Sequence, residues 1–408
     1  MVSYEPDLVK GFPEYLPPES IKYEKIRKIV QDQFELHGFL PVKTPSIEFD
    51  ELMRSDKLLG EEDEAVSDRF KFQDRGARNL GLRYEFTFQL SRIFKQHPNI
   101  KLPFRRFQIG SVFRDEPTST GRFKEFMQCD ADIIGDSSIE ADAECLAVGN
   151  NIVQHLKIPA EIQVNNRKLM VAILESIGIE KKNEVLKELD KIDKLGEDAV
   201  KTNLKKYADT NQVLTLFKLL EKNLEFFIKN LFDGADELFK LQQIGKQYGY
   251  VIKYNPFLVR GLSYYTGNIF EFKVQDTKNS IGGGGRYDKL VGKYLGREIP
   301  AVGISFGMER LFELSDITIE NKQVMIISLD KDKESRQLAQ RLRANKIECI
   351  ISRDKIGKAL EYANSYEIKY VIFLGSEEIK KEKYKLKDML SGKEQYLTEK
   401  QIVSKLTK

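Results

Sequence analysis

The chain has 408 residues, of which 41% are hydrophobic and 32% charged, and 66 Lys and Arg against 63 Asp and Glu give a net charge of +3. This composition can fill the cores of two or three domains and excludes a disordered chain. No apolar run approaches the roughly 18 residues that span a bilayer, and no signal peptide is predicted. We therefore expect a cytoplasmic protein without membrane segments.

The cysteines and histidines are few and scattered. An odd number of distant cysteines predicts a reducing compartment without disulfides, and no pair of these residues has the spacing of zinc ligands. We therefore expect no structural metal. The residues are Cys129, Cys145, Cys349, His37, His97 and His155.

The N-terminal part predicts one helix followed by extended chain. Apolar residues recur at helical spacing over residues 19–36, after two prolines and before a glycine. Prolines within residues 39–48 exclude a helix there and favour an edge or interface strand. Residues 104–114 and 126–135 bracket the turn-rich loop 115–121, which predicts an antiparallel hairpin with a long functional loop.

Residues 82–88 are interpreted as a further strand, whose alternation puts Arg83, Glu85 and Thr87 on one face. A carboxylate beside a hydroxyl suits an ammonium ligand, and a surface strand is the alternative. Between residues 168 and 247 prolines are absent and Leu, Lys and Glu dominate, which predicts an all-helical insertion.

After the insertion we expect strands at 257–259 and 268–274 and a helix near 306–314. From residue 324 to residue 375 apolar strands and amphipathic helices alternate, which predicts a small α/β domain with a mainly parallel sheet. Residues 323–408 hold 19 Lys and Arg against 13 Asp and Glu, so positive charge is concentrated there. Local positive charge of this kind fits an RNA partner.

The loop of the predicted hairpin carries residues suited to a nucleotide. Arg114 and Arg122 are placed to clamp a polyphosphate, since a guanidinium matches phosphate oxygens bidentately. Glu116 is suited to accept from an exocyclic amine and Phe126 to stack on a base. The alternative is a charged loop that only faces solvent.

Three glycine-containing segments are ambiguous by themselves. The glycine run within residues 279–288 allows a backbone to approach a ligand closely, but a flexible loop explains it equally well. Residues 258–267 combine an arginine with a Tyr-Tyr pair, and the alternative is a buried aromatic pair beside a surface arginine. Residues 303–311 run from a glycine-containing strand into a helix with Arg310, which close packing alone also explains.

Together and in this order, these segments resemble the histidyl-tRNA synthetases, a family of class II aminoacyl-tRNA synthetases, over essentially the whole chain. Residues 11–45 are similar to class II motif 1, residues 113–128 to motif 2 and residues 303–310 to motif 3. Residues 260–267 and 284–288 are similar to the two signatures specific to the histidine enzymes. Residues 126–135 resemble the archaeal and eukaryotic branch of the family.

The resemblance implies a site residue by residue. Arg114 would hold the α-phosphate of ATP, Arg122 and Arg310 the γ-phosphate, and Phe126 and Glu116 the adenine. Arg260 would contact the α-phosphate and the histidine carboxylate, so that Arg114, Gln128 and Arg260 are the implied catalytic residues. The residues implied to bind histidine are Glu85, Thr87, Gln128, Asp132, Arg260, Tyr264, Tyr265 and Tyr287. Position 263 is Ser where the family signature usually has Asp, which affects a hydrogen bond behind the tyrosines.

The implied fold is an α+β catalytic core with a mixed, mainly antiparallel sheet, a helical insertion domain and a C-terminal α/β anticodon-binding domain. The expected boundaries are 1–165 and 249–322 for the two parts of the core, 166–248 for the insertion and 323–408 for the anticodon-binding domain. The implied partners are histidine, tRNA(His), ATP with Mg²⁺, and a second copy of the chain through the motif 1 region.

Two other functions remain open at this stage. One is a regulatory subunit of histidine biosynthesis, which resembles the catalytic core but lacks the added C-terminal domain and tends to lose the signature arginines. The other is a class II synthetase for another amino acid, such as glycine or proline. The C-terminal domain and Arg114, Arg260 and Arg310 speak against the first, and the Tyr264-Tyr265 pair speaks against the second.

Overall fold

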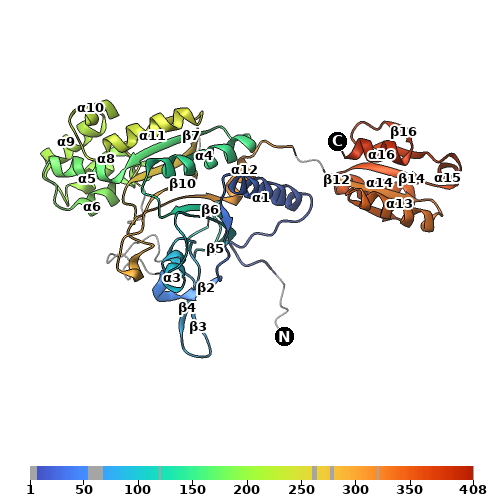
Figure 1. Ribbon diagram of the computed structural model, residues 1–408, viewed down its shortest axis with the longest axis horizontal. Helices are drawn as coiled ribbons and strands as arrows, with labels where there is room; N and C mark the ends of the chain where they lie inside the picture. The colour runs from blue at the N-terminus through green and yellow to red at the C-terminus, as the bar shows by residue number, and fades with distance from the viewer. Residues whose placement is uncertain are drawn as a thin grey trace. The chain divides into compact units, whose positions relative to one another are not determined.

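The computed structural model describes residues 7–53, 68–118, 121–259, 264–275, 280–318 and 321–407. The chain divides into two compact units (Figure 1). The first runs from residue 26 to residue 316 together with the N-terminal residues up to 14. The second comprises residues 317–408 together with residues 15–25.

An eight-stranded, mainly antiparallel sheet with the order β1-β5-β6-β11-β10-β9-β7-β8 forms the centre of the first unit. Only the outer pairs β1–β5 and β7–β8 are parallel. The strands are β1 (Leu40–Pro41), β5 (Phe104–Phe113), β6 (Glu125–Ile134), β7 (Ala160–Asn166), β8 (Ile252–Tyr254), β9 (Asn268–Val274), β10 (Ser280–Arg286) and β11 (Ala301–Gly307).

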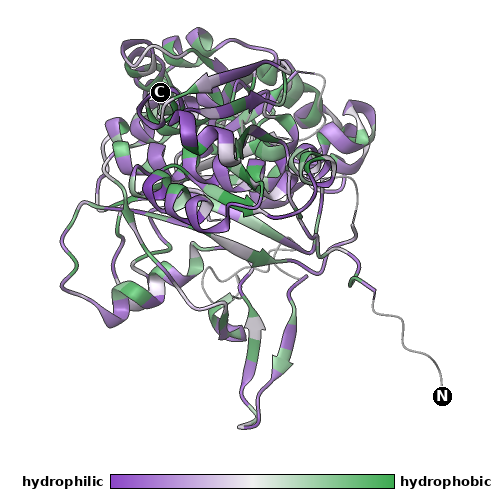
Figure 2. Ribbon diagram, turned by 90° about the vertical axis from the view of Figure 1, so that its right-hand side faces the viewer, coloured by the Kyte–Doolittle hydropathy of each residue, from purple (hydrophilic) through white to green (hydrophobic). Residues whose placement is uncertain are grey.

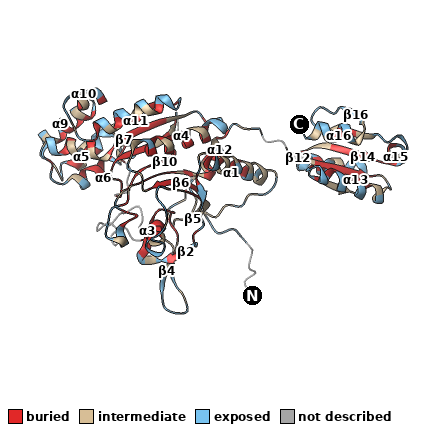
Figure 3. Cartoon of the chain, viewed as in Figure 1, coloured by how far each residue is buried: buried red, intermediate tan, exposed pale blue. Residues whose placement is uncertain are grey.

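The helices that accompany this sheet (Figure 1) include α1 (Glu19–Leu36), α3 (Phe88–Gln96), α4 (Ile139–His155) and the short α12 (Met308–Leu314). Helix α4 packs closely on the sheet, because a Cβ on its Gly149 would meet the side chains of Ile304 and Phe272 at 2.5 and 2.6 Å. The ring of Phe34 at the end of α1 lies 5.4 Å from that of Phe107 on β5. The central strands and the inner sides of these helices are buried (Figure 3).

A smaller sheet with the order β2-β4-β3 adjoins the 3-10 turn η1 (Asp50–Met53). Its strands are β2 (Ile47–Phe49), β3 (Lys71–Gln73) and β4 (Asn79–Leu82). The prediction of a strand over residues 82–88 was wrong, because β4 ends at Leu82 and α3 begins at Phe88. The intervening residues form a tight turn whose carboxylate at Glu85 accepts the first N–H groups of the helix.

Between β7 and β8 the chain is entirely helical, as the absence of proline predicted. Buried Leu, Ile, Val and Phe side chains recur along one side of the longer helices, and α11 (Ala235–Gln247) packs against α4 beside the sheet. Throughout the chain, many helices carry both hydrophilic and hydrophobic residues (Figure 2). The other helices of the segment are α5 (Arg167–Ser176), α6 (Lys182–Leu189), α7 (Ile192–Leu195), α8 (Glu197–Leu204), α9 (Thr210–Leu220) and α10 (Leu224–Lys229).

The second unit contains a five-stranded sheet with the order β13-β12-β14-β15-β16. The first three strands are parallel, as predicted, and β15 and β16 add an antiparallel edge that the sequence did not indicate. Helices α13 and α16 pack with one apolar cluster and α14 with another. The elements are β12 (Asn321–Ser328), α13 (Asp332–Ala344), β13 (Cys349–Ser352), α14 (Ile356–Ser365), β14 (Ile368–Leu374), α15 (Ser376–Lys381), β15 (Tyr384–Asp388), β16 (Glu394–Leu397) and α16 (Glu399–Leu406).

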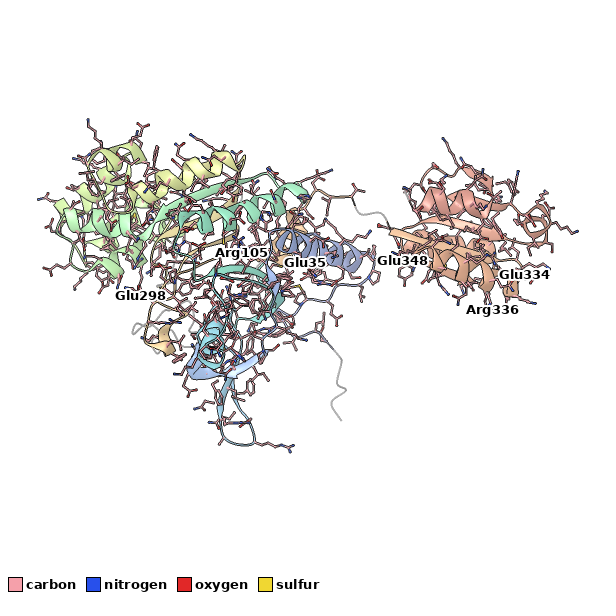
Figure 4. The ribbon with its side chains drawn as sticks, in the orientation of Figure 1. Glu35, Arg105, Glu298, Glu334, Arg336 and Glu348 are labelled. Atoms are coloured by element: carbon pink, nitrogen blue, oxygen red, sulfur yellow. The ribbon has the colours of Figure 1, made fainter. Side chains whose placement is uncertain are left out.

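Glu334 and Arg336 of α13 lie on the outer surface of the second unit (Figure 4). Ser335 between them is fully buried, which follows from the helical period. Among the described residues, no helix has the length and apolarity that crossing a membrane requires.

The observed elements confirm most of the sequence interpretation. The helix at 19–36, the hairpin of β5 and β6 and the strand at 268–274 are present. The strand predicted at 257–259 is absent, and the strand in that region is β8, a few residues earlier. The glycine run forms the central strand β10 rather than a flexible loop, because it is paired on both sides.

Candidate active site

A cleft of about 440 Å³ opens on one face of the eight-stranded sheet. It is lined by strands β6, β10 and β11, by the turn before α3 and by the start of α12. Among its lining residues are all the predicted site residues that the structure describes: Glu85, Thr87, Arg114, Glu116, Arg122, Phe126, Gln128, Asp132, Tyr264, Tyr265, Tyr287 and Arg310. Arg260 and Ser263 lie outside the described residues.

The alternation of a β-strand explains how β6 contributes to the cleft. Side chains two residues apart point to the same face, so Phe126, Gln128, Asp130 and Asp132 line the cleft together. The odd-numbered side chains, such as Cys129, face the opposite, buried side. One strand therefore presents an aromatic ring, an amide and two carboxylates in a row.

Glycines keep the middle of the cleft open. A Cβ on Gly303 of β11 would lie 2.0 Å from Oδ1 of Asp132. A Cβ on Gly284 of β10 would lie 1.9 Å from the carbonyl oxygen of Gly303. Any larger residue at these positions would force the strands or Asp132 to move, so the glycines are required by the close approach of β10, β11 and β6.

One end of the cleft is acidic and aromatic. Asp132 accepts a hydrogen bond from the hydroxyl of Tyr287 and forms an ion pair with Arg106, whose Nη2 lies 2.6 Å from its Oδ2. Both partners of this ion pair are almost fully buried. Burial raises the pKa of Asp132, and the neighbouring Arg106 opposes that rise.

The three predicted tyrosines form the aromatic part of the same end. The rings of Tyr264 and Tyr265 are 4.8 Å apart, and those of Tyr264 and Tyr287 are 5.8 Å apart. Tyr264 also contacts Phe88 edge to face at 6.0 Å. Burial raises the pKa values of Tyr264 and Tyr287 well above the ordinary value, so both hydroxyls keep their protons, and that of Tyr287 is donated to Asp132.

The turn before α3 supplies another carboxylate. Glu85 accepts backbone hydrogen bonds of 2.6 Å from both Thr87 and Phe88, which fixes its position at the helix start. Arg83 does not share a face with Glu85, contrary to the prediction for residues 82–88. Its guanidinium instead donates to the carbonyl oxygens of Ser111 and Thr44 at 2.7 and 2.9 Å and holds the turn to its neighbours.

The other end of the cleft is cationic. The guanidinium of Arg114 lies 4.3 Å from the ring centre of Tyr84 and 5.0 Å from that of Phe126. Arg122 lies 3.6 Å from Glu116 in an ion pair, and Tyr84 donates a 3.0 Å hydrogen bond to Glu116. The rings and the carboxylate therefore hold two arginines in the cleft without neutralising them fully.

A third arginine comes from α12. Arg310 donates to the carbonyl oxygen of Ser280 at the start of β10. Burial lowers its pKa, and the neighbouring positive charge of Arg122 lowers it further. Two arginines that approach one another across a cleft are a natural binding place for an anion.

Sequence reasoning missed two residues that line the cleft, Asp130 and Glu309, and the buried Arg106 that pairs with a third lining residue. Arg106 on β5 is fully buried and pairs with Asp132, Asp130 lies between Gln128 and Asp132, and Glu309 accepts from the backbone N–H of Met127 at 3.0 Å. The period of two along β6 was the available signal for Asp130. No pattern in the sequence indicated that Arg106 is buried beside Asp132, since charged residues alternate with apolar ones in many strands.

Arg286 in the second signature has a structural place. It pairs with the buried Asp142 and donates to the carbonyl oxygens of Asp136 and Ser138 at 2.9 and 2.8 Å. Its neighbour Tyr287 is the residue that reaches the cleft. In the part of the chain that the structure describes, no group of three or more His, Cys, Asp or Glu side chains is placed to hold a metal ion.

The antiparallel sheet, the hairpin of β5 and β6 and the strand-to-helix junction of β11 and α12 define a class II aminoacyl-tRNA synthetase. The family model for histidyl-tRNA synthetase matches residues 11–311, and that for an anticodon binding domain matches residues 323–408. The chain belongs to the histidyl-tRNA synthetase family.

Curated relatives agree with this assignment. A histidine–tRNA ligase 1 of Bacillus cereus is 38% identical over 95% of this chain and 94% of its own length. A histidine–tRNA ligase of Clostridium tetani is 33% identical over 97% of this chain and 96% of its own length. These relatives are bacterial, so the expected membership of the archaeal and eukaryotic branch is not supported.

Solved structures support the fold alone, since their identities are low. A histidyl-tRNA synthetase from Nostoc matches with a TM-score of 0.87 and 24% identity over 99% of both chains. A protein from Bacillus halodurans, described as an ATP phosphoribosyltransferase regulatory subunit/histidyl-tRNA synthetase, matches with a TM-score of 0.76 and 21% identity over 91% of this chain and 99% of its own. The fold therefore does not separate an enzyme from a regulator, and the side chains of the cleft must do so.

Proposed function

We propose that this chain is a histidine–tRNA ligase. It activates L-histidine with ATP to histidyl-adenylate and pyrophosphate, and then transfers histidine to the 3′-terminal ribose of tRNA(His), releasing AMP. The observation that carries the proposal is the polarity of one cleft, whose acidic and aromatic end around Asp132 adjoins a cationic end around Arg114 and Arg310. A zwitterionic amino acid and a polyphosphate need these two environments side by side.

ATP binds at the cationic end. Phe126 stacks on adenine and Glu116 accepts from the adenine amino group. Arg114 contacts the α-phosphate, while Arg122 and Arg310 hold the γ-phosphate. The lowered pKa of Arg310, caused first by burial and then by repulsion with Arg122, supports this place, because a bound anion would counter both effects. Mg²⁺ enters as part of the substrate, the ATP complex.

Histidine binds at the acidic end. Glu85, Thr87 and Gln128 orient its ammonium and carboxylate groups. Asp132 and the tyrosines 264, 265 and 287 surround the imidazole, which needs both a donor and an acceptor. Because these buried polar groups would lose their partners with an apolar analogue, the pocket rejects such analogues by about 10⁴–10⁵ without editing.

Adenylate formation is an in-line displacement at the α-phosphorus. A carboxylate oxygen of histidine forms the new P–O bond as the bond to pyrophosphate breaks. Arg114 and Arg260 stabilise the charge on the pentacoordinate phosphorus, and the cleft holds both substrates in line. In the second step the ribose hydroxyl attacks the activated carbonyl carbon and AMP leaves, with a phosphate oxygen of the adenylate, or the amino group once it has lost its extra proton, as the proton acceptor.

The remaining parts of the chain serve the tRNA and the assembly. The C-terminal domain, residues 323–408, binds the anticodon, and its positive charge supports contact with phosphates. Residues 1–165 and 249–322 form the catalytic core around the insertion 166–248. The chain forms a homodimer through residues 11–45, and it works in the cytoplasm. The dimer is supported by exposed apolar side chains in this region and next to it, including Leu40 and Phe49.

Charging of tRNA tests the proposal. The unaltered chain is expected to attach labelled histidine to tRNA(His) in the presence of ATP and Mg²⁺. Arg260→Ala is expected to abolish pyrophosphate exchange while circular dichroism and thermal melting stay close to those of the unaltered chain. A chain that neither exchanges pyrophosphate nor charges tRNA would be the regulator, and near-normal exchange by Arg260→Ala would refute the role of that arginine.

A further inference from the structure

The floor of the acidic end contains a second carboxylate for which the function described above has no role. Asp130 lies on β6 between Gln128 and Asp132 and lines the cleft, although it is only 3% exposed. Its Oδ2 accepts a 3.1 Å hydrogen bond from Nε2 of Gln128. Its Oδ1 and the Oε1 of Gln128 have no hydrogen-bond partner among the described residues.

We propose that Asp130 is a positioning residue: its carboxylate holds the Gln128 amide so that Oε1 of Gln128 is presented to the bound amino acid. An ionised carboxylate only accepts hydrogen bonds, so it fixes the NH₂ group of the amide on its own side. The oxygen is then the group left for the substrate, whose ammonium can only donate. The inference rests on the proposed function in that it takes an amino acid as the ligand.

Burial makes this arrangement necessary. An amide that could turn over would present NH₂ to an ammonium, and two donors facing each other in a buried site cost the hydrogen bond and leave both groups unpaired. Glu85 cannot replace the amide oxygen fully, because its carboxylate already accepts from the N–H groups of Thr87 and Phe88. The orientation of Gln128 therefore affects the affinity for histidine directly.

The charges around Asp130 make the arrangement sensitive to pH. Arg106 on β5 favours its ionised form, while Asp132 on β6 and Glu85 before α3 oppose it, and Tyr264 is a further titratable neighbour. Burial is the largest effect, and it raises the pKa of Asp130 to about 7. A protonated Asp130 can donate a hydrogen bond, so it no longer fixes the amide.

Binding of an amino acid must then couple to proton release. The ammonium brings a positive charge near Asp130, Asp132 and Glu85, and an opposite charge at this distance stabilises the ionised carboxylate. Near pH 7, about half of the free protein carries the proton, so binding should release on the order of 0.5 proton from Asp130. Affinity for the amino acid should fall as the pH is lowered through 7.

Calorimetry on the unaltered chain tests this without any variant. The probe is 1,2,4-triazole-3-alanine, an isostere of histidine whose ring does not take up a proton near pH 7. Titrations at pH 7 in two buffers with different ionisation enthalpies give the number of protons released. Release of on the order of 0.5 proton at pH 7 and much less at pH 8.5 is expected. Tight binding with no proton release at pH 7 would overturn the proposal.

The variant Asp130→Asn tests the positioning itself. Asparagine keeps the shape but can both donate and accept, so the Gln128 amide is no longer fixed. In ATP–pyrophosphate exchange at pH 8 we expect KM for histidine to rise about tenfold, with kcat and KM for ATP within about threefold, because one hydrogen bond is weakened. The dependence of KM on pH between 6 and 8 should also flatten.

Asp74→Asn is the matched control, since it makes the same substitution at a surface carboxylate that pairs with Arg78 and does not line the cleft. It should keep the pH dependence of the unaltered chain. Asp130→Asn with unchanged KM and an unchanged pH profile would refute the positioning role. Absence of exchange by the unaltered chain would refute the proposed function instead, so the two failures are distinguishable.

Discussion

Arg114 offers the sharpest separation of catalysis from stability. Its half-buried guanidinium stacks against Tyr84 and Phe126 and makes a long 3.4 Å contact to the carbonyl oxygen of Tyr84. Two such cation–π contacts contribute about 1–2 kcal/mol to stability. A preorganised cation at the α-phosphate contributes about 2.7–4 kcal/mol to the transition state, or 10²–10³ in kcat.

Arg114→Ala should therefore lose 10²–10³ in kcat for ATP–pyrophosphate exchange with only a small fall in melting temperature. Arg114→Lys should recover little, since an ammonium cannot contact two phosphate oxygens with the geometry of a guanidinium. The control is Arg78→Ala, at an exposed arginine that pairs with Asp74 away from the cleft. A loss of exchange that merely tracks the loss of folded protein, or less than a tenfold loss, would refute this reasoning.

Four further outcomes are expected. Gly303→Ala should raise KM for histidine more than KM for ATP, because its Cβ would displace Asp132. Arg106→Met should lower the unfolding free energy by about 3–5 kcal/mol in denaturant titrations, since it leaves Asp132 buried without its ion pair. The raised pKa of Asp130, about 7 when folded against 3.8, costs stability increasingly as pH rises from 4 to 7, so Asp130→Asn should gain melting temperature relative to the unaltered chain at pH 8 but not at pH 4. Deletion of residues 323–408 should spare histidine activation more than tRNA charging, and equal losses in the two assays would contradict a tRNA-binding role.

Apolar spacing and the positions of proline and of turn residues predicted the helices and the hairpin that form from neighbouring residues in the sequence. The helix at 19–36 and the helices of the insertion follow from apolar spacing and from the absence of proline. The β5–β6 hairpin follows from two apolar runs around a turn-rich loop. The glycine run became β10 because it is paired on both sides, and close approach to β11 requires residues without a Cβ.

The residues of the candidate site could be predicted from the sequence where they belong to motifs of the family. Twelve predicted side chains line one cleft, although no pattern in the sequence says that Glu85 and Tyr287 lie near one another. Arg83 was misplaced because a carboxylate that accepts the first N–H groups of α3 ends the strand pattern early. The position of Arg106 beside Asp132 depends on the pairing of β5 with β6, which sequence spacing alone does not reveal.

The central claim is that the cleft activates histidine, and ATP–pyrophosphate exchange across the twenty amino acids tests it most directly. The predicted result is exchange that depends on histidine. The exchange rate with apolar amino acids should be lower than that with histidine by a factor of at least about 10⁴. Asp132→Ala should remove the preference while Arg78→Ala keeps it. Exchange stimulated by glycine or proline in place of histidine, or no exchange with any amino acid, would contradict the account.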